Sequence, residues 1–142
     1  MAAIVSLAPG SAVDGHRTRL LQGMAQAVAE KGYADTTISD IVREASVSRR
    51  TFYEHFGSKA ECLIALYEAA SRNALKVLRD AIDASHAWDE QLERAIGAYL
   101  SCMAAEPALM RTLFIEILHL GPEGPAARGA VNQEIADYMV AV

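Results

Sequence analysis

Two helix-start signals, 21 residues apart, limit what the stretch between them can form. Thr37 precedes Asp40, and Ser58 precedes Glu61, by the three residues of a capping box. In a capping box, two side chains satisfy backbone N–H groups that have no partner at the start of a helix. Because a helix starts at each signal, the residues between them can form only short helices.

That stretch has the pattern of two short amphipathic helices. After Thr37, apolar residues at i, i+3, i+4 and i+7 form one buried face: Ile38, Ile41, Val42 and Ala45. Ser46 interrupts the pattern, and Ser48 can cap a second helix over 49–56, which buries its two phenylalanines. Two short helices joined by a turn of a few residues form a helix-turn-helix.

The rest of the chain is also patterned as helices. Apolar residues at every fourth position predict a helix over 16–31, which Asp14 caps and Gly32 ends. Further helices are expected over 58–85, 88–105, 107–120 and 126–142, with Gly124 and Pro125 in the loop before the last. Hydrophobic residues make up 52% of the chain, and β-branched residues do not alternate with polar ones. The predicted fold class is therefore all-α.

The second short helix carries Arg49, Arg50 and Thr51 in its first turn. In a helix-turn-helix, these positions meet base edges in the major groove, where the fork of arginine matches two acceptors of guanine. The net charge is −5, yet residues 16–59 carry seven basic and five acidic residues. Positive charge is thus concentrated at this end, as expected of a protein that binds double-stranded DNA.

Three runs of residues strengthen this interpretation: Thr-Thr-Ile-Ser-Asp-Ile at 36–41, Ala-Ser-Val-Ser at 45–48 and Thr-Phe-Tyr-Glu-His-Phe-Gly-Ser-Lys at 51–59. With Gly32 and Tyr33 before them, they resemble the signature of the tetracycline-repressor (TetR) family of transcriptional regulators. The resemblance is close over 17–66, and beyond it only the helical layout is similar. One position departs from the family pattern, since the turn carries Ser46 where glycine is usual.

The resemblance implies a role for each matching residue. Arg49, Arg50 and Thr51 would contact bases. A second group would hold phosphates: Thr37, Ser48, Tyr53, His55 and Lys59. Hydroxyl groups, cations and helix N-termini all suit phosphate oxygens.

The resemblance also implies two domains, a helix-turn-helix DNA-binding domain over 14–60 and a helical ligand-binding and dimerisation domain over 61–142. The expected cavity residues in the second domain are large and mostly apolar: Trp88, Leu92, Ile96, Tyr99, Met103, Phe114, Ile117 and Tyr138. We expect a repressor that binds a palindromic operator as a homodimer. A small apolar or aromatic effector would release it from the DNA.

Two other hypotheses remain open. The family resemblance implies two more C-terminal helices, whereas this chain stops at Val142 in mid-helix, as if incomplete. A protein–protein interaction module without operator binding is therefore an alternative. A redox sensor acting through Cys62 or Cys102 is another.

Other classes of function find no support in the sequence. The chain has no nucleophile elbow, phosphate-binding loop or metal-ligand spacing, so neither an enzyme nor a metal or other cofactor is expected. Residues 1–12 lack the basic start of a signal peptide and are expected to form a loose arm. No apolar run is long enough for a membrane span, which favours a cytoplasmic protein.

Overall fold

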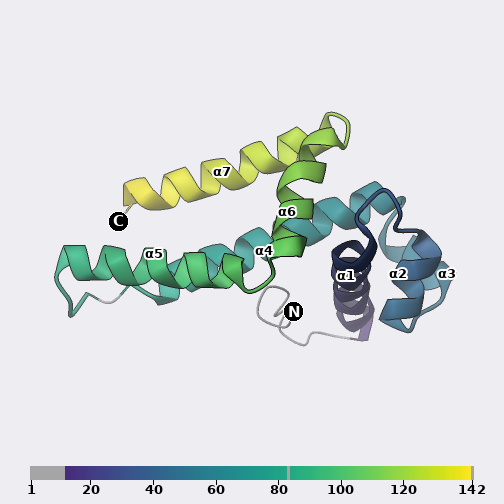
Figure 1. Ribbon diagram of the computed structural model, residues 1–142, viewed down its shortest axis with the longest axis horizontal. Coiled ribbons are helices and arrows are strands. Elements are labelled where there is room, and N and C mark those ends of the chain that lie inside the picture. The colour runs from purple at the N-terminus through teal and green to yellow at the C-terminus, as the bar shows by residue number, and fades with distance from the viewer. Residues whose placement is uncertain (1–11, 83, 142) are drawn as a thin grey trace.

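The computed structural model describes residues 12–82 and 84–141, and all regular elements in these ranges are helices (Figure 1). The α-helices are α1 (Ala12–Lys31), α2 (Ile38–Ala45), α3 (Arg49–His55), α4 (Lys59–Asp80), α5 (Trp88–Ala104), α6 (Pro107–Glu116) and α7 (Glu123–Ala141). A 3-10 turn, η1 (Ile117–His119), follows α6. The all-α prediction is confirmed. The arm expected at 1–12 falls almost entirely outside the described residues.

Three hydroxyl side chains start the helices of the N-terminal half, as the sequence predicted. Thr37 Oγ1 accepts the N–H of Asp40 at 3.1 Å, and Asp40 Oδ2 accepts the N–H of Thr37 at 2.9 Å. Ser48 caps α3 and Ser58 caps α4, each through the N–H three residues ahead. Glu61 accepts the N–H of Gly57 and not that of Ser58, so only half of the capping box predicted at Ser58 forms. The limits of α2, α3 and the start of α4 therefore follow from local hydrogen bonds.

The core of the N-terminal half lies where α1 packs against α2, α3, α4 and α6. Its fully buried side chains come from all five helices and η1: Leu20, Leu21, Met24, Ile41, Phe52, Leu63, Leu66, Leu109, Leu113 and Ile117. Beyond it, α4 runs on towards α5 and α7, which lie on either side of its far half (Figure 1). One long helix is thus shared by the N-terminal bundle and the C-terminal half.

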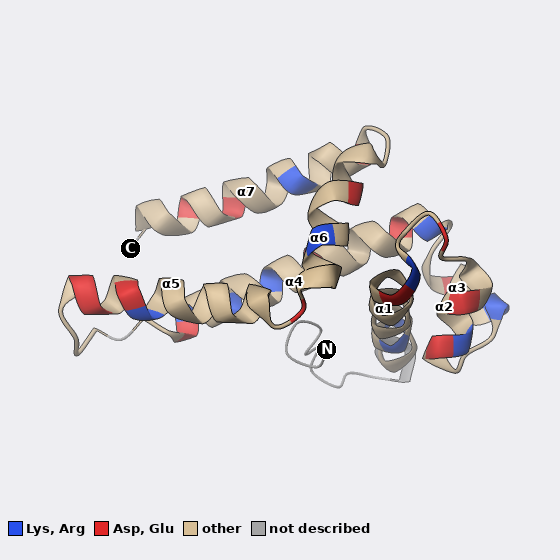
Figure 2. Cartoon of the chain, in the orientation of Figure 1, with Lys and Arg blue, Asp and Glu red and all other residues tan. Residues whose placement is uncertain are grey.

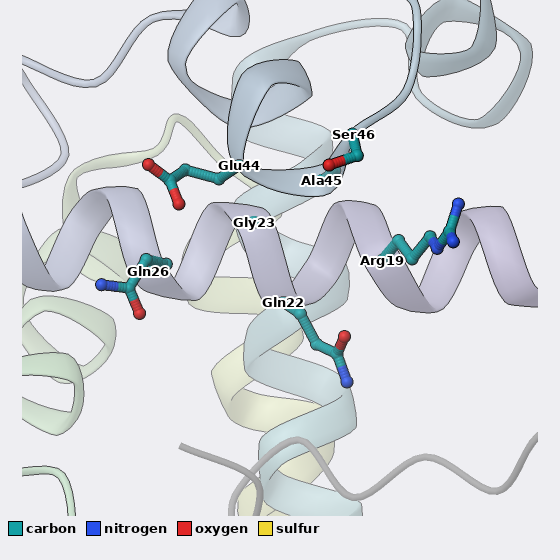
Figure 3. Close-up of a pocket in the computed structure, with 7 residues that line it drawn as sticks. All are labelled: Arg19, Gln22, Gly23, Gln26, Glu44, Ala45 and Ser46. Carbon is teal, nitrogen blue, oxygen red and sulfur yellow. The ribbon is translucent and has the colours of Figure 1, made fainter.

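Gly23 sets the distance between α1 and α2. A Cβ atom at this position would lie 2.7 Å from the carbonyl oxygen of Ile41 and 3.0 Å from the backbone nitrogen of Ala45. Figure 3 shows α1 passing directly beneath Ala45 and Ser46 at this point. The crossing leaves an open polar hollow, which Arg19 and Glu44 help to line. The two backbones can approach this closely only because residue 23 has no side chain.

Several predicted helix limits are wrong. The first helix already begins at Ala12, so Asp14 lies within it and does not cap it. The fourth ends at Asp80 instead of residue 85, and α6 tightens into η1 after Glu116. The terminal turns of helices are often irregular, and sequence patterns locate them poorly.

The loop predicted at Gly124 and Pro125 is also wrong, because both residues lie in the first turn of α7. Proline is tolerated there, since the first N–H groups of a helix have no partner within the helix. A Cβ atom at Gly124 would lie 1.9 Å from the carbonyl oxygen of Ile117. This glycine therefore permits a close approach of η1 to α7, and it does not mark a loop.

Candidate nucleic-acid interface

The first turn of α3 presents the residues predicted to read bases. Arg49 and Arg50 are exposed and Thr51 is half-buried. Arg49 Nη1 donates to Ser39 Oγ at 2.9 Å, which links the first turn of α3 to the first turn of α2. Arg50 Nε lies 3.4 Å from Glu54 Oε1 in an exposed ion pair. Both guanidinium groups are held only by exposed side chains, so they can exchange those partners for DNA at little cost.

Ser48 and Thr51 are coupled at the start of α3. Ser48 Oγ accepts the N–H of Thr51 at 3.1 Å, and the two hydroxyl oxygens are 3.0 Å apart. Tyr53 is 53% exposed, and its ring packs edge-on against the buried ring of Phe52. The apolar side of α3 therefore fixes the helix, while its hydroxyl groups stay near the surface.

The side chain of Lys59 folds back against Tyr33 and does not extend into solvent. Its Nζ donates to the carbonyl oxygen of Tyr33 at 2.9 Å and lies 4.1 Å from the centre of the Tyr33 ring. The same carbonyl accepts the N–H of Thr36. Lys59 thus ties the start of α4 to the loop between α1 and α2, next to Thr37. His55, also predicted to hold phosphate, is half-buried at the end of α3 with its ring beside Phe56.

Asp40 anchors the start of α2. Besides the cap, its Oδ1 accepts from Lys31 Nζ and from Arg43 Nη2, both at 3.0 Å. The hydrogen bond from the Thr37 N–H, followed by those from Lys31 and the Thr37 hydroxyl, holds the pKa of Asp40 well below its usual range. The sequence analysis missed this network, although the i, i+3 spacing of Asp40 and Arg43 was a usable signal. Lys31 could not have been found, because a loop separates it from α2.

Charges of both signs are interspersed over the N-terminal helices (Figure 2). Ser46 makes the turn between α2 and α3 with a φ of 55°, in the left-handed region that favours glycine. The departure from the family pattern is therefore accommodated by the serine backbone itself. Among the predicted DNA contacts, Arg49 and Arg50 lie in the first turn of α3 and Lys59 lies at the start of α4.

The C-terminal half contains an apolar groove of about 320 Å³, called here the outer groove. Its floor is α4 together with Ile82, just beyond the end of that helix, and its walls are α5 and α7. The lining residues are Leu75, Leu78, Ile82, Trp88, Gln91, Leu92, Ala95, Ile96, Tyr99, Ile135, Tyr138 and Met139. Five of the eight predicted cavity residues line it. Leu75 and Leu78 on the groove floor were not among the predicted cavity residues.

A smaller cavity of about 70 Å³, called the inner cavity, adjoins this groove. It is lined by residues of α4, α5, α6 and α7: Tyr67, Ala70, Ser71, Ala74, Tyr99, Met103, Met110, Leu113, Phe114, Val131, Asn132 and Ile135. Met103 and Phe114 are therefore placed here and not in the outer groove. Ile117 lines neither space, because it is fully buried in the core.

The two cysteines lie in different surroundings. Cys62 is fully buried, and burial raises the pKa of its thiol to about 12. Such a thiol stays protonated at neutral pH and reacts slowly with oxidants, which argues against Cys62 as a redox sensor. Cys102 is half-buried. Within residues 12–82 and 84–141, no helix is long and apolar enough to cross a membrane.

Comparison with known proteins adds three findings. Residues 20–66 match the family described as bacterial regulatory proteins, tetR family. The chain is 30% identical over 129 residues to the Uncharacterized HTH-type transcriptional regulator YerO of Bacillus subtilis, across 89% of this chain and 41% of that protein. It is 22% identical over 121 residues to the Fatty acid metabolism regulator protein of the same organism, across 85% and 61%.

Among solved structures, the fatty acid degradation regulator FadR from Bacillus halodurans has the same fold. The two structures match with a TM-score of 0.74 at 20% identity, over 95% of this chain and 69% of that chain. The chain spans less than two thirds of the length of the two B. subtilis relatives.

Proposed function

The chain belongs to the tetR family of bacterial regulatory proteins, and on that premise we propose that it is a DNA-binding transcriptional regulator. The observation that carries the proposal is the first turn of α3, where Arg49 and Arg50 are exposed and Arg49 donates to Ser39 in the first turn of α2. Arg49, Arg50 and Thr51 contact bases in the major groove. Thr37, Ser48, Tyr53, His55 and Lys59 hold phosphates on either side.

The DNA-binding unit spans residues 14–60, and the regulatory unit spans residues 61–142. The protein binds a palindromic operator as a homodimer, because two recognition helices related by a two-fold axis require two half-sites about one helical turn apart. It acts as a repressor that an effector releases.

The effector site is the outer groove, which supports an apolar ligand. Two relatives are named for fatty acid metabolism and fatty acid degradation, which agrees with an apolar effector. The α4 helix is continuous from Lys59, at the DNA-binding end, to Leu75 and Leu78 on the groove floor. A ligand that favours the tilt of α4 in which the two recognition helices no longer match the half-sites lowers the affinity for DNA, and by linkage DNA lowers the affinity for that ligand equally.

A selection from random double-stranded oligonucleotides tests the proposal directly. The 142-residue chain should enrich one sequence with two inverted half-sites. The Arg49→Ala/Arg50→Ala double variant is the matched control, since both side chains are exposed and their loss leaves the core intact. If a folded chain enriches no sequence, the protein–protein interaction module replaces the regulator.

A further inference from the structure

The outer groove and the inner cavity are adjacent and share part of their walls. Tyr99 of α5 and Ile135 of α7 line both. The outer groove opens between the exposed side chains of Trp88, Leu92 and Met139. The inner cavity lies nearer the N-terminal end of α4, where α6 also contributes to the wall. A ligand that enters between α5 and α7 would therefore reach the inner cavity with its leading end.

The two parts differ in chemistry. The outer groove is lined almost wholly by aliphatic and aromatic side chains, with Gln91 as its one amide. The inner cavity gathers the hydroxyl groups of Tyr67, Ser71 and Tyr99 and the amide of Asn132. Tyr67 is only 3% exposed. Several hydrogen-bonding groups at one end of an otherwise apolar site are suited to fix the orientation of a ligand with a single polar end.

The charge around the inner cavity distinguishes between polar groups. Among the residues that the structure describes, no Asp, Glu, Lys or Arg lines either space. Arg128 of α7 lies just behind the wall, where it donates to the carbonyl oxygen of Phe114 at 3.3 Å and lies 5.9 Å from the centre of the Phe114 ring. Burial raises the pKa of Tyr67, and the positive charge of Arg128 opposes this rise. The inner cavity thus favours a negative group over a positive one.

We propose that the ligand of this site is a single-chain alkyl carboxylate, with its carboxylate in the inner cavity and its chain along the outer groove. This inference rests on the proposed effector site. The inner cavity, at about 70 Å³, has less than a quarter of the volume of the outer groove, at about 320 Å³. A carboxylate with one alkyl chain matches this division, whereas an ester of a bulky carrier does not fit the inner end.

The only tryptophan of the chain provides a direct readout. Trp88 lines the outer groove and is 59% exposed, so an alkyl chain that covers it should shift its emission to shorter wavelengths. The 142-residue chain is titrated with hexanoate, decanoate, decan-1-ol and decyltrimethylammonium, each below its aggregation concentration. Affinity should rise by up to about fourfold per added methylene from hexanoate to decanoate. Decanoate should bind at least tenfold more tightly than decyltrimethylammonium.

Variants locate the carboxylate. Arg128→Gln should weaken decanoate several-fold and leave decan-1-ol unchanged, and Arg128→Lys should restore most of the loss. Ser71→Ala should weaken both ligands. Ser101→Ala is the matched control, since Ser101 is exposed on α5 and lines neither space. Circular dichroism confirms that each variant is folded.

Three outcomes would overturn the proposal. One is equal binding of decyltrimethylammonium and decanoate, and another is an unchanged decanoate affinity in Arg128→Gln. The third is an emission wavelength of Trp88 that changes with protein concentration but with none of the four ligands. That result would make the outer groove a contact between copies of the chain. Release of DNA is measured separately. Decanoate that shifts Trp88 but leaves DNA bound supports the placement and contradicts the gating in the proposed function.

Discussion

At the scale of single residues, Ser46 and Gly32 share an unusual backbone conformation. Both adopt a positive φ, 55° at Ser46 and 78° at Gly32, and each follows the last residue of a helix. For a residue with a side chain, this conformation costs on the order of 1–2 kcal/mol. The serine therefore holds the turn of the helix-turn-helix at a cost that glycine avoids.

Replacing Ser46 with glycine should stabilise the chain by about 0.5–1 kcal/mol, after allowance for the greater freedom of glycine in the unfolded state. Gly32→Ala should destabilise it by about 1 kcal/mol. No atom lies within 4 Å of a Cβ at Gly32, so only the backbone is tested there. Urea unfolding measures both, and a loss of stability in Ser46→Gly would contradict the assignment of strain.

Gly23→Ala should destabilise the chain by about 1–3 kcal/mol, because the new methyl group meets the backbone of α2. The control is Gly97→Ala, at a position inside α5 where no atom lies within 4 Å. It should stabilise the chain by up to about 1 kcal/mol, since alanine is the better helix former. Thermal unfolding compares the two. Equal changes in stability in the two variants would show that the close approach of α1 and α2 does not depend on the missing side chain at residue 23.

Asp40→Asn should lower the melting temperature at pH 7 and have a much smaller effect near pH 1.5. The folded-state pKa of Asp40 is depressed, so its contribution is complete above its ordinary value of 3.8 and is lost as the pH falls through the much lower folded-state pKa. The difference between wild type and variant isolates this carboxylate from the others. An equal difference at both pH values would assign the effect to the shape of the side chain and not to its charge.

At the scale of elements, the capping residues determined which helices could be predicted. Thr37, Ser48 and Ser58 are local signals, and α2, α3 and the start of α4 follow from them. The ion pair of Lys31 with Asp40 and the bond of Lys59 to Tyr33 could not be predicted. Each joins residues across a loop, and their distance depends on how α1 packs against α2 and α4.

The start of α4 gives a prediction for this scale. If the proposed phosphate contact forms, Lys59→Ala should weaken binding to every DNA sequence and reduce the slope of log affinity against log salt by about one unit. Lys59→Arg is the control that keeps the charge. Because Lys59 also donates to the carbonyl oxygen of Tyr33, its loss can destabilise the fold, so the Tm of each variant is measured as well. An unchanged salt slope together with a lower Tm would assign Lys59 to the fold alone.

At the scale of the whole molecule, α4 connects the DNA-binding helices to the outer groove. Five of the eight predicted cavity residues line the outer groove, but the sequence pattern could not divide the eight between groove, cavity and core. A large apolar side chain suits all three surroundings, and only the packing of α5, α6 and α7 decides among them. Ile117 lies in the core, whereas Trp88 lies at the surface.

Base reading by α3 is tested most directly by fluorescence anisotropy on two DNA duplexes. Affinity is measured at fixed salt for wild type, Arg49→Ala and Arg50→Ala, on the selected operator and on a scrambled duplex of the same composition. At least one arginine variant should lose about 1–3 kcal/mol on the operator and clearly less on the scrambled duplex. Equal losses on both duplexes, in both variants, would mean that neither arginine reads sequence. That result would contradict base reading by α3.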